Sequence, residues 1–497
     1  MRRRDVLAGG VAAGVCLAVP ARAAGEPFDG NTVRALAKDL ASKPYKAPNA
    51  KLPDAIAKLN YDQYRMIRFD ARRALWRGLN LPFEAQLLHR GFLYNDRVDL
   101  HEVADGRSTP IAYSQDMFDF GPLAPPALGD LGFAGFRIHA PINRADYFDE
   151  VCVFVGASYF RAVAKGQGYG LSARGLSIKT GDPGGEEFPG FRAFWLERPR
   201  PGVDVVVVHA LLDSQSCAAA YRFTIRPGTE TVFDVESVIY PRVDIDQVGL
   251  ATMTSMFDFD PSARAGVDDW RAAVHDSDGM QIANGHGDQL WRPLANPHDL
   301  QVSVFEDNHP RGFGLMQRAR NFRDYQDLEA HYERRPSLWV EPIGDVGEGG
   351  VHLVEIPTKG EIHDNIVAFW RPRNKLLAKS ETGFTYRLRW CNDLPATPDL
   401  ARISHTRAGS AGEKARLFVL DIAGDALKKL AADAKPSVAV AADHGKILHA
   451  VAQPNPETGG WRASFELAPA ASVVELRAQL MLDTTPLSEV WVYRWTA

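Results

Sequence analysis

Two groups of acidic residues carry the clearest chemical potential in this sequence. Asp364 and Asn365 stand between two apolar segments, and Asp276 and Asp278 stand in the short polar segment 275–279. Two carboxyl groups that face each other across a cleft are typical of glycoside hydrolysis, because one protonates the leaving oxygen while the other activates water. A polar turn at a strand end is the alternative for each group, and for Asp364 taken alone it is the favoured interpretation.

A metal site is the weaker interpretation of segment 275–279. Its alternating aspartates precede Gly279 as in a calcium loop, but Met280 follows directly and no bidentate glutamate closes the loop. The sequence contains no CxxC or HExxH motif, and its histidines show no ligand spacing. We therefore expect neither a metal ion nor another cofactor.

The residues around Asp364 indicate that β-strands hold it in place. An apolar segment begins at Leu353, and a second one, 366–370, follows Asp364 and ends before Pro372. A carboxylate at the mouth of such a strand has a rigid backbone and still faces solvent or a cleft. This position suits acid–base chemistry.

Period-two patterns predict further strands along most of the chain. We expect them at 84–94, 97–103, 203–212, 221–225, 231–239 and 384–390. The turn pairs Asn95-Asp96 and Pro227-Gly228 predict hairpins between the first two and between the fourth and fifth of these strands. The continuous apolar run at 203–212 predicts burial on both faces. Helices are expected between a capping Asn31 and Pro44, at 54–59 and at 324–334.

The first 23 residues have the pattern of an export signal. Arg3 and Arg4 fit a twin-arginine motif, an apolar, glycine-rich run covers 6–19, and Ala21-Arg22-Ala23 provides a cleavage site. A membrane anchor is the alternative, but the apolar run is too short and too rich in glycine to span a bilayer easily. We therefore predict a cleaved twin-arginine signal peptide at 1–23.

Length and composition describe a globular protein with two domains. At 497 residues the chain exceeds what one core normally organises, and its 45% hydrophobic content excludes a disordered protein. The formal charge is −5, and the net +3 of residues 1–23 leaves −8 on the rest, which argues against nucleic-acid binding. Of the three cysteines beyond the leader, Cys152 and Cys217 lie in apolar runs and are expected to be buried thiols.

Motifs such as Tyr332-Glu-Arg-Arg335 and Glu361-Ile-His-Asp364 belong to a series of blocks that extends over most of the chain. These blocks are 61–68, 157–162, 168–175, 185–189, 275–279, 332–342 and 353–372. Together they resemble the periplasmic glucan biosynthesis family, whose G and D proteins shape osmoregulated periplasmic glucans. The resemblance implies an all-β protein, with a large mutarotase-like β-sandwich at 24–392 and a small immunoglobulin-like β-sandwich at 404–497. The proline-containing segment 393–403 is expected to be the linker.

The same resemblance implies a role in glucan biosynthesis in the periplasm. Some members cleave or transfer β-1,2-glucan by an inverting mechanism, so we expect a β-glucan as partner and an inverting hydrolase or transglycosylase as activity. A non-catalytic glucan-binding protein that works with the membrane glucan glucosyltransferase is the alternative. A homodimer is left open, and the twin-arginine signal favours the D type within the family.

Site residues follow from the resemblance and from general sugar chemistry. Asp364 matches the family's general acid. Asp276 is the expected general base. Asp278 is the alternative base and an expected substrate contact. Aromatic side chains cover the C–H faces of sugars, and arginine or glutamate side chains supply directed hydrogen bonds. The expected sugar-binding residues are Tyr169, Tyr332, Trp339, Trp370, Arg161, Arg335 and Glu341. For each of these taken singly, a core or salt-bridge role is the favoured alternative, and Trp370 is the weakest because its strand looks buried.

One feature of the block before Asp364 bears on the mechanism. Proton transfer in this family can pass through ordered waters and a sugar hydroxyl, and Glu361-Ile-His363 provides no hydroxyl of its own. If a protein hydroxyl is needed, we expect slow hydrolysis, or transfer of glucan instead of hydrolysis.

Overall fold

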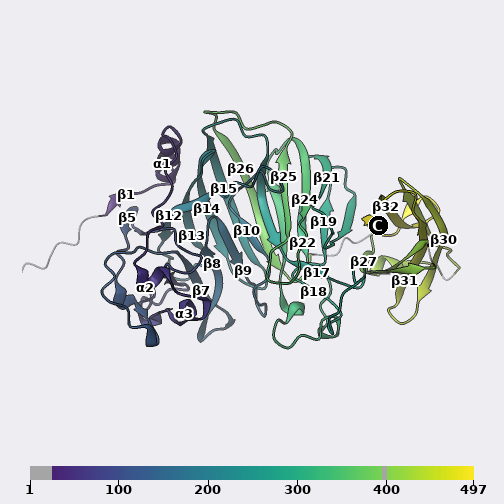
Figure 1. Ribbon diagram of the computed structural model, residues 1–497, viewed down its shortest axis with the longest axis horizontal. Coiled ribbons are helices and arrows are strands. Elements are labelled where there is room, and N and C mark those ends of the chain that lie inside the picture. Colours follow the sequence, from purple (N-terminus) through teal and green to yellow (C-terminus); the bar gives the residue numbers. More distant parts are fainter. Residues whose placement is uncertain (1–24, 395–399, 413, 432) are drawn as a thin grey trace, which may run out of the picture.

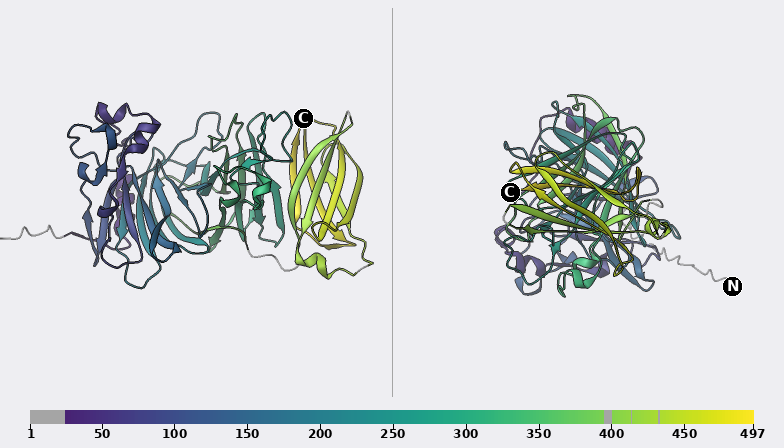
Figure 2. Two further views of the ribbon diagram at one scale, coloured as in Figure 1. Left: turned by 90° about the horizontal axis from the view of Figure 1, so that it is seen from below. Right: turned by 90° about the vertical axis from the view of Figure 1, so that its right-hand side faces the viewer.

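The computed structural model describes residues 25–394, 400–412, 414–431 and 433–497. The predicted signal peptide and residues 395–399 of the predicted linker lie outside them. Strands make up nearly all of the regular structure, which confirms the prediction of an all-β sandwich fold. The molecule is elongated, with the N-terminal strands and short helices at one end and the C-terminal strands at the other (Figures 1 and 2).

Two large sheets form the body of the protein. The larger has the order β1 (Glu26–Pro27), β5 (Arg107–Pro110), β4 (Asp99–Ala104), β12 (Gly190–Glu197), β13 (Val206–Asp213), β14 (Cys217–Arg226), β15 (Thr231–Pro241), β26 (Thr382–Cys391), β23 (Ser337–Ile343), β22 (Gly312–Met316), β19 (Gly279–Ala283), β20 (Gln289–Pro293), β34 (Val490–Thr496), β32 (Val473–Leu482) and β29 (Ser437–Ala442), with β33 (Thr485–Pro486) beside β32. The second has the order β21 (Gln301–Asn308), β24 (Glu348–Glu355), β25 (Ile366–Pro372), β16 (Val248–Ser255), β10 (Ser172–Arg174), β9 (Tyr159–Ala162), β8 (Tyr147–Val155), β7 (Gly135–Arg144) and β3 (Glu84–Leu88), with β11 (Ser177–Ile178) beside β16.

Three smaller sheets complete the strands. A four-stranded sheet has the order β27 (Arg402–Ala411), β28 (Ala415–Ala423), β31 (Gly460–Ala468) and β30 (Lys446–Asn455). Two-stranded pairs are formed by β17 (Phe257–Phe259) with β18 (Val274–His275), and by β2 (Arg68–Phe69) with β6 (Phe118–Asp119).

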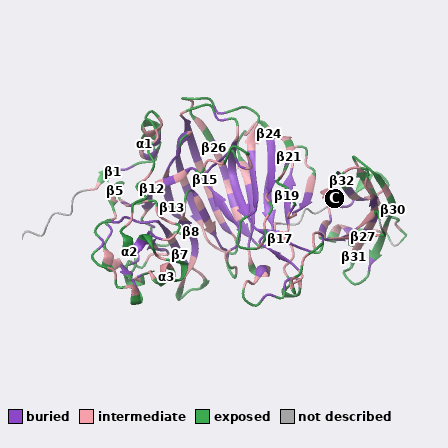
Figure 3. Cartoon of the chain, in the orientation of Figure 1, coloured by how far each residue is buried: buried purple, intermediate pink, exposed green. Residues whose placement is uncertain are grey.

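Aromatic rings fill the space between the two large sheets. Phe154 of β8 stacks on Phe136 and Phe160, with ring centroids 5.0 and 5.1 Å apart, and meets Phe223 of the larger sheet at 5.2 Å. The central strands are correspondingly buried (Figure 3). Close packing of this kind makes the sheets a rigid support for groups on their outer faces.

A single longer helix covers the outer face of the larger sheet, opposite the second sheet. Helix α1 (Thr32–Ala41) buries Val33 and Ala37 against β13, β14 and β15. Asp29, not the expected Asn31, caps it: the Asp29 Oδ1 accepts from the backbone N–H groups of Asn31 and Thr32. The other helices, α2 (Asp54–Ala57) and α3 (Tyr61–Met66), are short, and within the described residues no helix is long and apolar enough to cross a membrane.

The C-terminal strands are joined to the body by a shared sheet. Leu290 and Trp291 of β20 pair in parallel with Val490 and Trp491 of β34, so the larger sheet continues into the last strands. The four-stranded sheet packs against these strands and forms a second sandwich. An Arg318–Glu489 ion pair of 2.5 Å, nearly buried, crosses the same junction. The two sandwiches are therefore connected by more than the chain between them.

Several expected elements are present. Strands β14 and β15 form the hairpin predicted around Pro227-Gly228, and β24 pairs with β25 on either side of Asp364. Strand β13 is covered on one face by the core and on the other by α1. Cys152, Cys217 and Cys391 are buried free thiols, and burial raises the pKa of Cys217 to about 12.

The hairpin predicted around Asn95-Asp96 is wrong. The first of its strands ends at Leu88 as β3 and pairs with β7, whereas β4 pairs with β5 and β12 in the other sheet. In the segment between them, the buried guanidinium of Arg90 donates to the carbonyl group of Asn95 at 3.0 Å and to that of Leu131, from a distant loop, at 2.7 Å. These contacts replace the predicted two-residue turn.

The helix predicted at 324–334 is also wrong. Two 3-10 turns, η4 (Phe322–Asp324) and η5 (Tyr332–Arg334), take its place. Gln326 and His331 have φ angles of 60° and 46°, in the left-handed region that a right-handed helix excludes. The Asp327 carboxylate accepts the backbone N–H groups of Glu329 and Ala330, so side-chain bonds hold this loop open.

A buried ion pair links the two large sheets and supports a stability prediction. Arg292 of β20 and Glu355 of β24 have 2% and 0% of their side chains exposed, with 2.9 Å between Nη2 and Oε2. Glu355→Ala leaves the guanidinium buried without its partner, so we expect a loss of about 3–5 kcal/mol in the free energy of unfolding, measured by urea denaturation. The exposed Glu306→Ala on β21 is the control and should change it by less than about 0.5 kcal/mol. A loss for Glu355→Ala no larger than that of the control would contradict this account.

Asp260, beside the junction with the C-terminal sandwich, makes stability depend on pH. Burial raises the pKa of Asp260 from 3.8 to about 7. The backbone N–H groups of Ser262 and Ala263 and the Ser262 hydroxyl all donate to Oδ1, which leaves Oδ2 free to carry a proton. Since the folded chain binds this proton more tightly than the unfolded chain, its contribution to stability is present below the unfolded pKa and declines as pH rises from about 4 to about 7.

Asp260→Asn should remove this part of the pH dependence. It keeps the Oδ1 acceptor but carries no ionisable group, so at about pH 8 we expect it to raise the free energy of unfolding by about 2 kcal/mol. Urea denaturation at a series of pH values measures the difference, with exposed Asp105→Asn as the control. Parallel pH curves for the wild type and Asp260→Asn would show that Asp260 ionises normally.

Candidate functional site

A pocket of about 540 Å³ lies where β8 and β9 meet the segment before β25. Arg161 of β9 reaches Asp364 with 3.4 Å between Nη2 and Oδ2, although the two residues stand far apart in the sequence. Asp364 is accessible, with 33% of its side chain exposed. The other lining residues are Leu93, Tyr94, Val153, Val155, Gly156, Ala157, Tyr159, Phe160 and Tyr169.

Asp276 lies close to this pocket and is buried. Its side chain is 6% exposed and forms a close ion pair with Arg335. Burial raises the pKa of Asp276, Arg335 opposes the rise, and the nearby charge of Asp364 adds to it. The structure thus places Asp276 close enough to Asp364 to feel its charge, so the two predicted catalytic carboxylates share one electrostatic environment.

The backbone of Phe257 connects the two acidic segments. Its N–H donates to the Asn365 side-chain oxygen at 2.8 Å, and its carbonyl accepts from the Asn365 Nδ2 at 2.9 Å. Phe257 also pairs with His275 across β17 and β18. Asn365 thus acts as a clamp that fixes the start of β25, and with it Asp364, relative to the residue before Asp276. The sequence places Asn365 beside Asp364 but gives no sign of this partner.

Tyr332 and Arg335 continue the site on the far side of Asp276. The Arg335 guanidinium lies 4.2 Å from the centroid of the Tyr332 ring. The Tyr332 hydroxyl donates to Glu361 Oε2 at 2.5 Å, and Arg271 donates to the same oxygen at 2.8 Å. The segment 361–363 lacks a hydroxyl of its own, but Tyr332 places one beside it.

The loop that carries Tyr169 packs beside Arg335. The Gly168 N–H donates to the Arg334 carbonyl at 3.2 Å, and a Cβ on Gly170 would come within 2.9 Å of the Arg335 side chain. The Tyr169 hydroxyl donates to Glu150 at 3.0 Å, which fixes the ring against the pocket wall. Arg161, Tyr169, Tyr332 and Arg335 therefore gather around the two carboxylates.

The other expected sugar contacts lie elsewhere. Trp370 is fully buried in the core between the sheets. Trp339 and Glu341 share one face of β23, and Leu338 and Val340, on the opposite face, point into that core. Trp339 packs toward the C-terminal sandwich, and Glu341 pairs with an arginine of the neighbouring strand, Arg389, at 2.8 Å. Strand alternation explains both departures, because it turns these two side chains away from the sheet interface.

Asp278, the fallback base, also faces a different cavity. Its Oδ2 accepts the backbone N–H groups of Arg318 and Ala319, both at 2.9 Å. The cavity beside it, of about 230 Å³, reaches residues 404–407 of the C-terminal sandwich. Asp278 therefore stabilises the loop after β22 and is not part of the pocket that holds Asp364.

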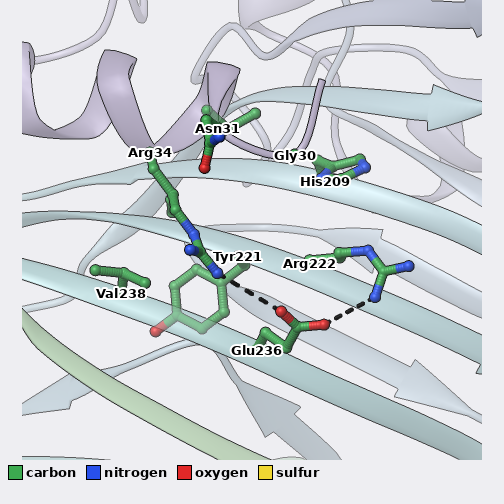
Figure 4. A pocket seen from close by; sticks show the side chains of 10 residues that line it. Gly30, Asn31, Arg34, His209, Tyr221, Arg222, Glu236 and Val238 are labelled. Carbon is green, nitrogen blue, oxygen red and sulfur yellow. Dashed lines mark hydrogen bonds and ion pairs between the residues drawn. The ribbon is translucent and has the colours of Figure 1, made fainter. Parts of the chain in front are cut away.

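A further pocket, of about 260 Å³, lies under α1 on the outer face of the larger sheet (Figure 4). In it Glu236 pairs with Arg222 at 2.8 Å and with Arg34 at 3.6 Å. None of the predicted site residues lines this pocket. Its single carboxylate is held between two arginines, so it does not offer the pair of carboxyl groups found at the Asp364 site.

Comparison with known proteins identifies the family. The sequence model of the family described as "Periplasmic glucan biosynthesis protein, MdoG" matches residues 28–495. A glucans biosynthesis protein G of Rhodopseudomonas palustris (strain ATCC BAA-98 / CGA009) is 58% identical over 501 residues, covering 100% of both chains. Another, from strain BisA53, is 61% identical over 470 residues, which cover 94% of this chain and 93% of that protein. A glucans biosynthesis protein G of Vibrio cholerae serotype O1 (strain ATCC 39541 / Classical Ogawa 395 / O395) is 50% identical over 476 residues, with 94% and 87% covered.

The chain belongs to the periplasmic glucan biosynthesis protein family. This confirms the resemblance found in the sequence. All three relatives carry the G name, whereas the twin-arginine signal had favoured the D type.

Proposed function

We propose that this chain acts on β-1,2-glucan in the periplasm as an inverting hydrolase or transglycosylase that shapes the glucan backbone. The observation that carries the proposal is the pairing of an accessible carboxylate, Asp364, with a buried one, Asp276, in one electrostatic environment beside a pocket of about 540 Å³. Inverting cleavage needs two carboxyl groups with different surroundings. The pocket walls supply tyrosine rings and the guanidinium of Arg161, which suit sugar faces and hydroxyls.

The family resemblance assigns the role of general acid to Asp364, and we infer that Asp276 is the general base. As the general acid, Asp364 gives a proton to the glycosidic oxygen as the bond from that oxygen to C1 breaks. Asp276 takes a proton from the water whose oxygen bonds to C1 from the opposite face. The raised pKa of Asp276 makes it a stronger base than an exposed carboxylate, while the ion pair with Arg335 keeps it charged. In transglycosylation a glucan hydroxyl takes the place of that water.

The Tyr332–Glu361 contact places a hydroxyl close to Arg335, the partner of Asp276. A phenol that donates at 2.5 Å to a carboxylate is held in one orientation. Tyr332 can therefore position a water or a sugar hydroxyl between the substrate and the acidic groups, a role that residues 361–363 alone do not fill.

A non-catalytic glucan-binding protein that works with the membrane glucosyltransferase is the second candidate. The Arg161–Asp364 contact favours it, because a carboxylate in an ion pair holds no proton to donate. Under this alternative the same tyrosines and arginines bind glucan without cleaving it.

Product analysis separates the two candidates. Purified protein is incubated with linear β-1,2-glucan, the products are resolved by size, and glucan affinity is measured in parallel by calorimetry. The enzyme proposal predicts shorter chains, or chains of altered length from transfer. Tight binding with no change in chain length under any condition would favour the binding protein.

A further inference from the structure

Three exposed apolar side chains stand on loops near the carboxylate site. Trp270 is 73% exposed, Leu328 is 78% exposed and Ile362 is 84% exposed. Each is flanked on both sides by a charged residue or a histidine, as in Asp269-Trp270-Arg271. We refer to these three residues as the rim triad.

Arg271 ties the three loops of the rim triad together. Its guanidinium pairs with Asp269 at 2.8 Å, with Asp327 at 3.0 Å and with Glu361 at 2.8 Å, and only 14% of its side chain is exposed. The carboxylate residues Asp327 and Glu361 immediately precede Leu328 and Ile362, and Arg271 itself follows Trp270. All three apolar residues are therefore chain neighbours of one ion-pair cluster.

The rim triad is also continuous with the site. Glu361 Oε2, which accepts from Arg271, accepts from the Tyr332 hydroxyl as well. The Tyr332 ring lies against Arg335, which holds Asp276. One unbroken chain of contacts thus runs from the residue next to Trp270 to a catalytic carboxylate of the proposed reaction.

The loop that carries Trp270 is held firmly. The Arg264 guanidinium donates to the backbone carbonyl groups of Asp269 and Arg271, both at 2.5 Å, and lies 5.0 Å from the centroid of the Phe259 ring. A large exposed ring on a fixed backbone loses little conformational entropy when a ligand covers it. Such a ring is suited to binding and contributes nothing to the core.

We propose that the rim triad, and Trp270 above all, is a second contact for the glucan chain, outside the pocket where bonds are cleaved. This rests on the proposed function. A sugar chain presents apolar C–H faces bordered by hydroxyl groups, and the rim presents an indole and two aliphatic tips bordered by Asp269, Asp327 and Glu361. A protein partner would instead favour a contiguous apolar patch, which the interposed charges break up. The contact would give longer glucan chains an advantage over short ones.

The test uses binding, so that it does not depend on turnover. In an Asp364→Asn background, calorimetry measures the Kd for short and for long linear β-1,2-glucan oligosaccharides. Trp270→Ala should raise the Kd for the long chains about tenfold and leave that for the short chains unchanged, and Trp270→Phe should retain most of the affinity. Leu377→Ala, which removes another exposed apolar side chain from the loop before β26, is the control and should change neither.

Three outcomes would overturn the inference. Equal losses for short and long chains would place Trp270 in the pocket itself, and no loss for either would exclude it from glucan binding. A change in self-association by light scattering, without a change in glucan affinity, would assign the rim triad to a contact between copies of the chain. If the wild type binds long glucan through Trp270 but never cleaves it, the enzyme proposal fails while this inference stands.

Discussion

Asp364→Asn should lower kcat on linear β-1,2-glucan by about a hundredfold or more, while the Kd for glucan stays within about threefold of the wild type. The amide keeps the size and the contact to Arg161 but has no proton to give to the leaving oxygen. Steady-state kinetics and calorimetry measure the two quantities. Asp204→Asn, an exposed carboxylate before β13, is the matched control and should leave both unchanged.

A substrate with an activated leaving group sharpens the Asp364 result. Such a leaving group departs with little protonation, so it should restore much of the lost rate in Asp364→Asn. Full activity of Asp364→Asn on unmodified glucan would place the chemistry in another part of the molecule.

Asp276→Asn should cause a loss of similar size, about a hundredfold or more in kcat, for a different reason. The amide cannot take a proton from the attacking water, and Arg335 loses its charged partner. An activated leaving group should not rescue this variant, because the missing step is the attack and not the departure. Rescue equal to that of Asp364→Asn would contradict the assignment of the two roles.

The pH dependence gives an independent readout for Asp276. The base must be ionised, and burial raises its pKa, so kcat/KM should fall on the acidic side at a pH above the ordinary carboxyl range. Arg335 lowers that pKa, so Arg335→Gln should move the acidic limb to higher pH. A purely structural role for Arg335 would lower the rate without moving the limb.

The sequence predicts the position of Asp364 well because its signal is local. Apolar segments define β24 and β25, and a carboxylate between two such strands lies at their mouth. The family resemblance then places Arg161, Tyr169, Tyr332 and Arg335 around the carboxylates. None of these contacts follows from spacing, since Arg161 and Asp364 are brought together only by the pairing of distant strands.

The predictions that proved wrong have physical causes that a single sequence does not display. The helical pattern at 324–334 is overridden by the ion pair between Arg271 and Asp327 and by the left-handed backbone at Gln326 and His331. Trp339 lies in one of the blocks that carry the family resemblance. The pairing of β23 with β22 and β26, however, decides which face of β23 points into the core. No sequence pattern points to Arg271, because its three carboxylate partners lie on three separate loops.

The configuration of the newly formed reducing end tests the central claim most directly. Proton NMR spectra, recorded immediately after wild-type protein is mixed with linear β-1,2-glucan, show the anomer before mutarotation mixes the two forms. A pair of carboxylates that places water on the face opposite the leaving oxygen predicts the α-anomer first. Initial formation of the β-anomer would mean a covalent intermediate and retention, and would contradict the roles assigned to Asp364 and Asp276.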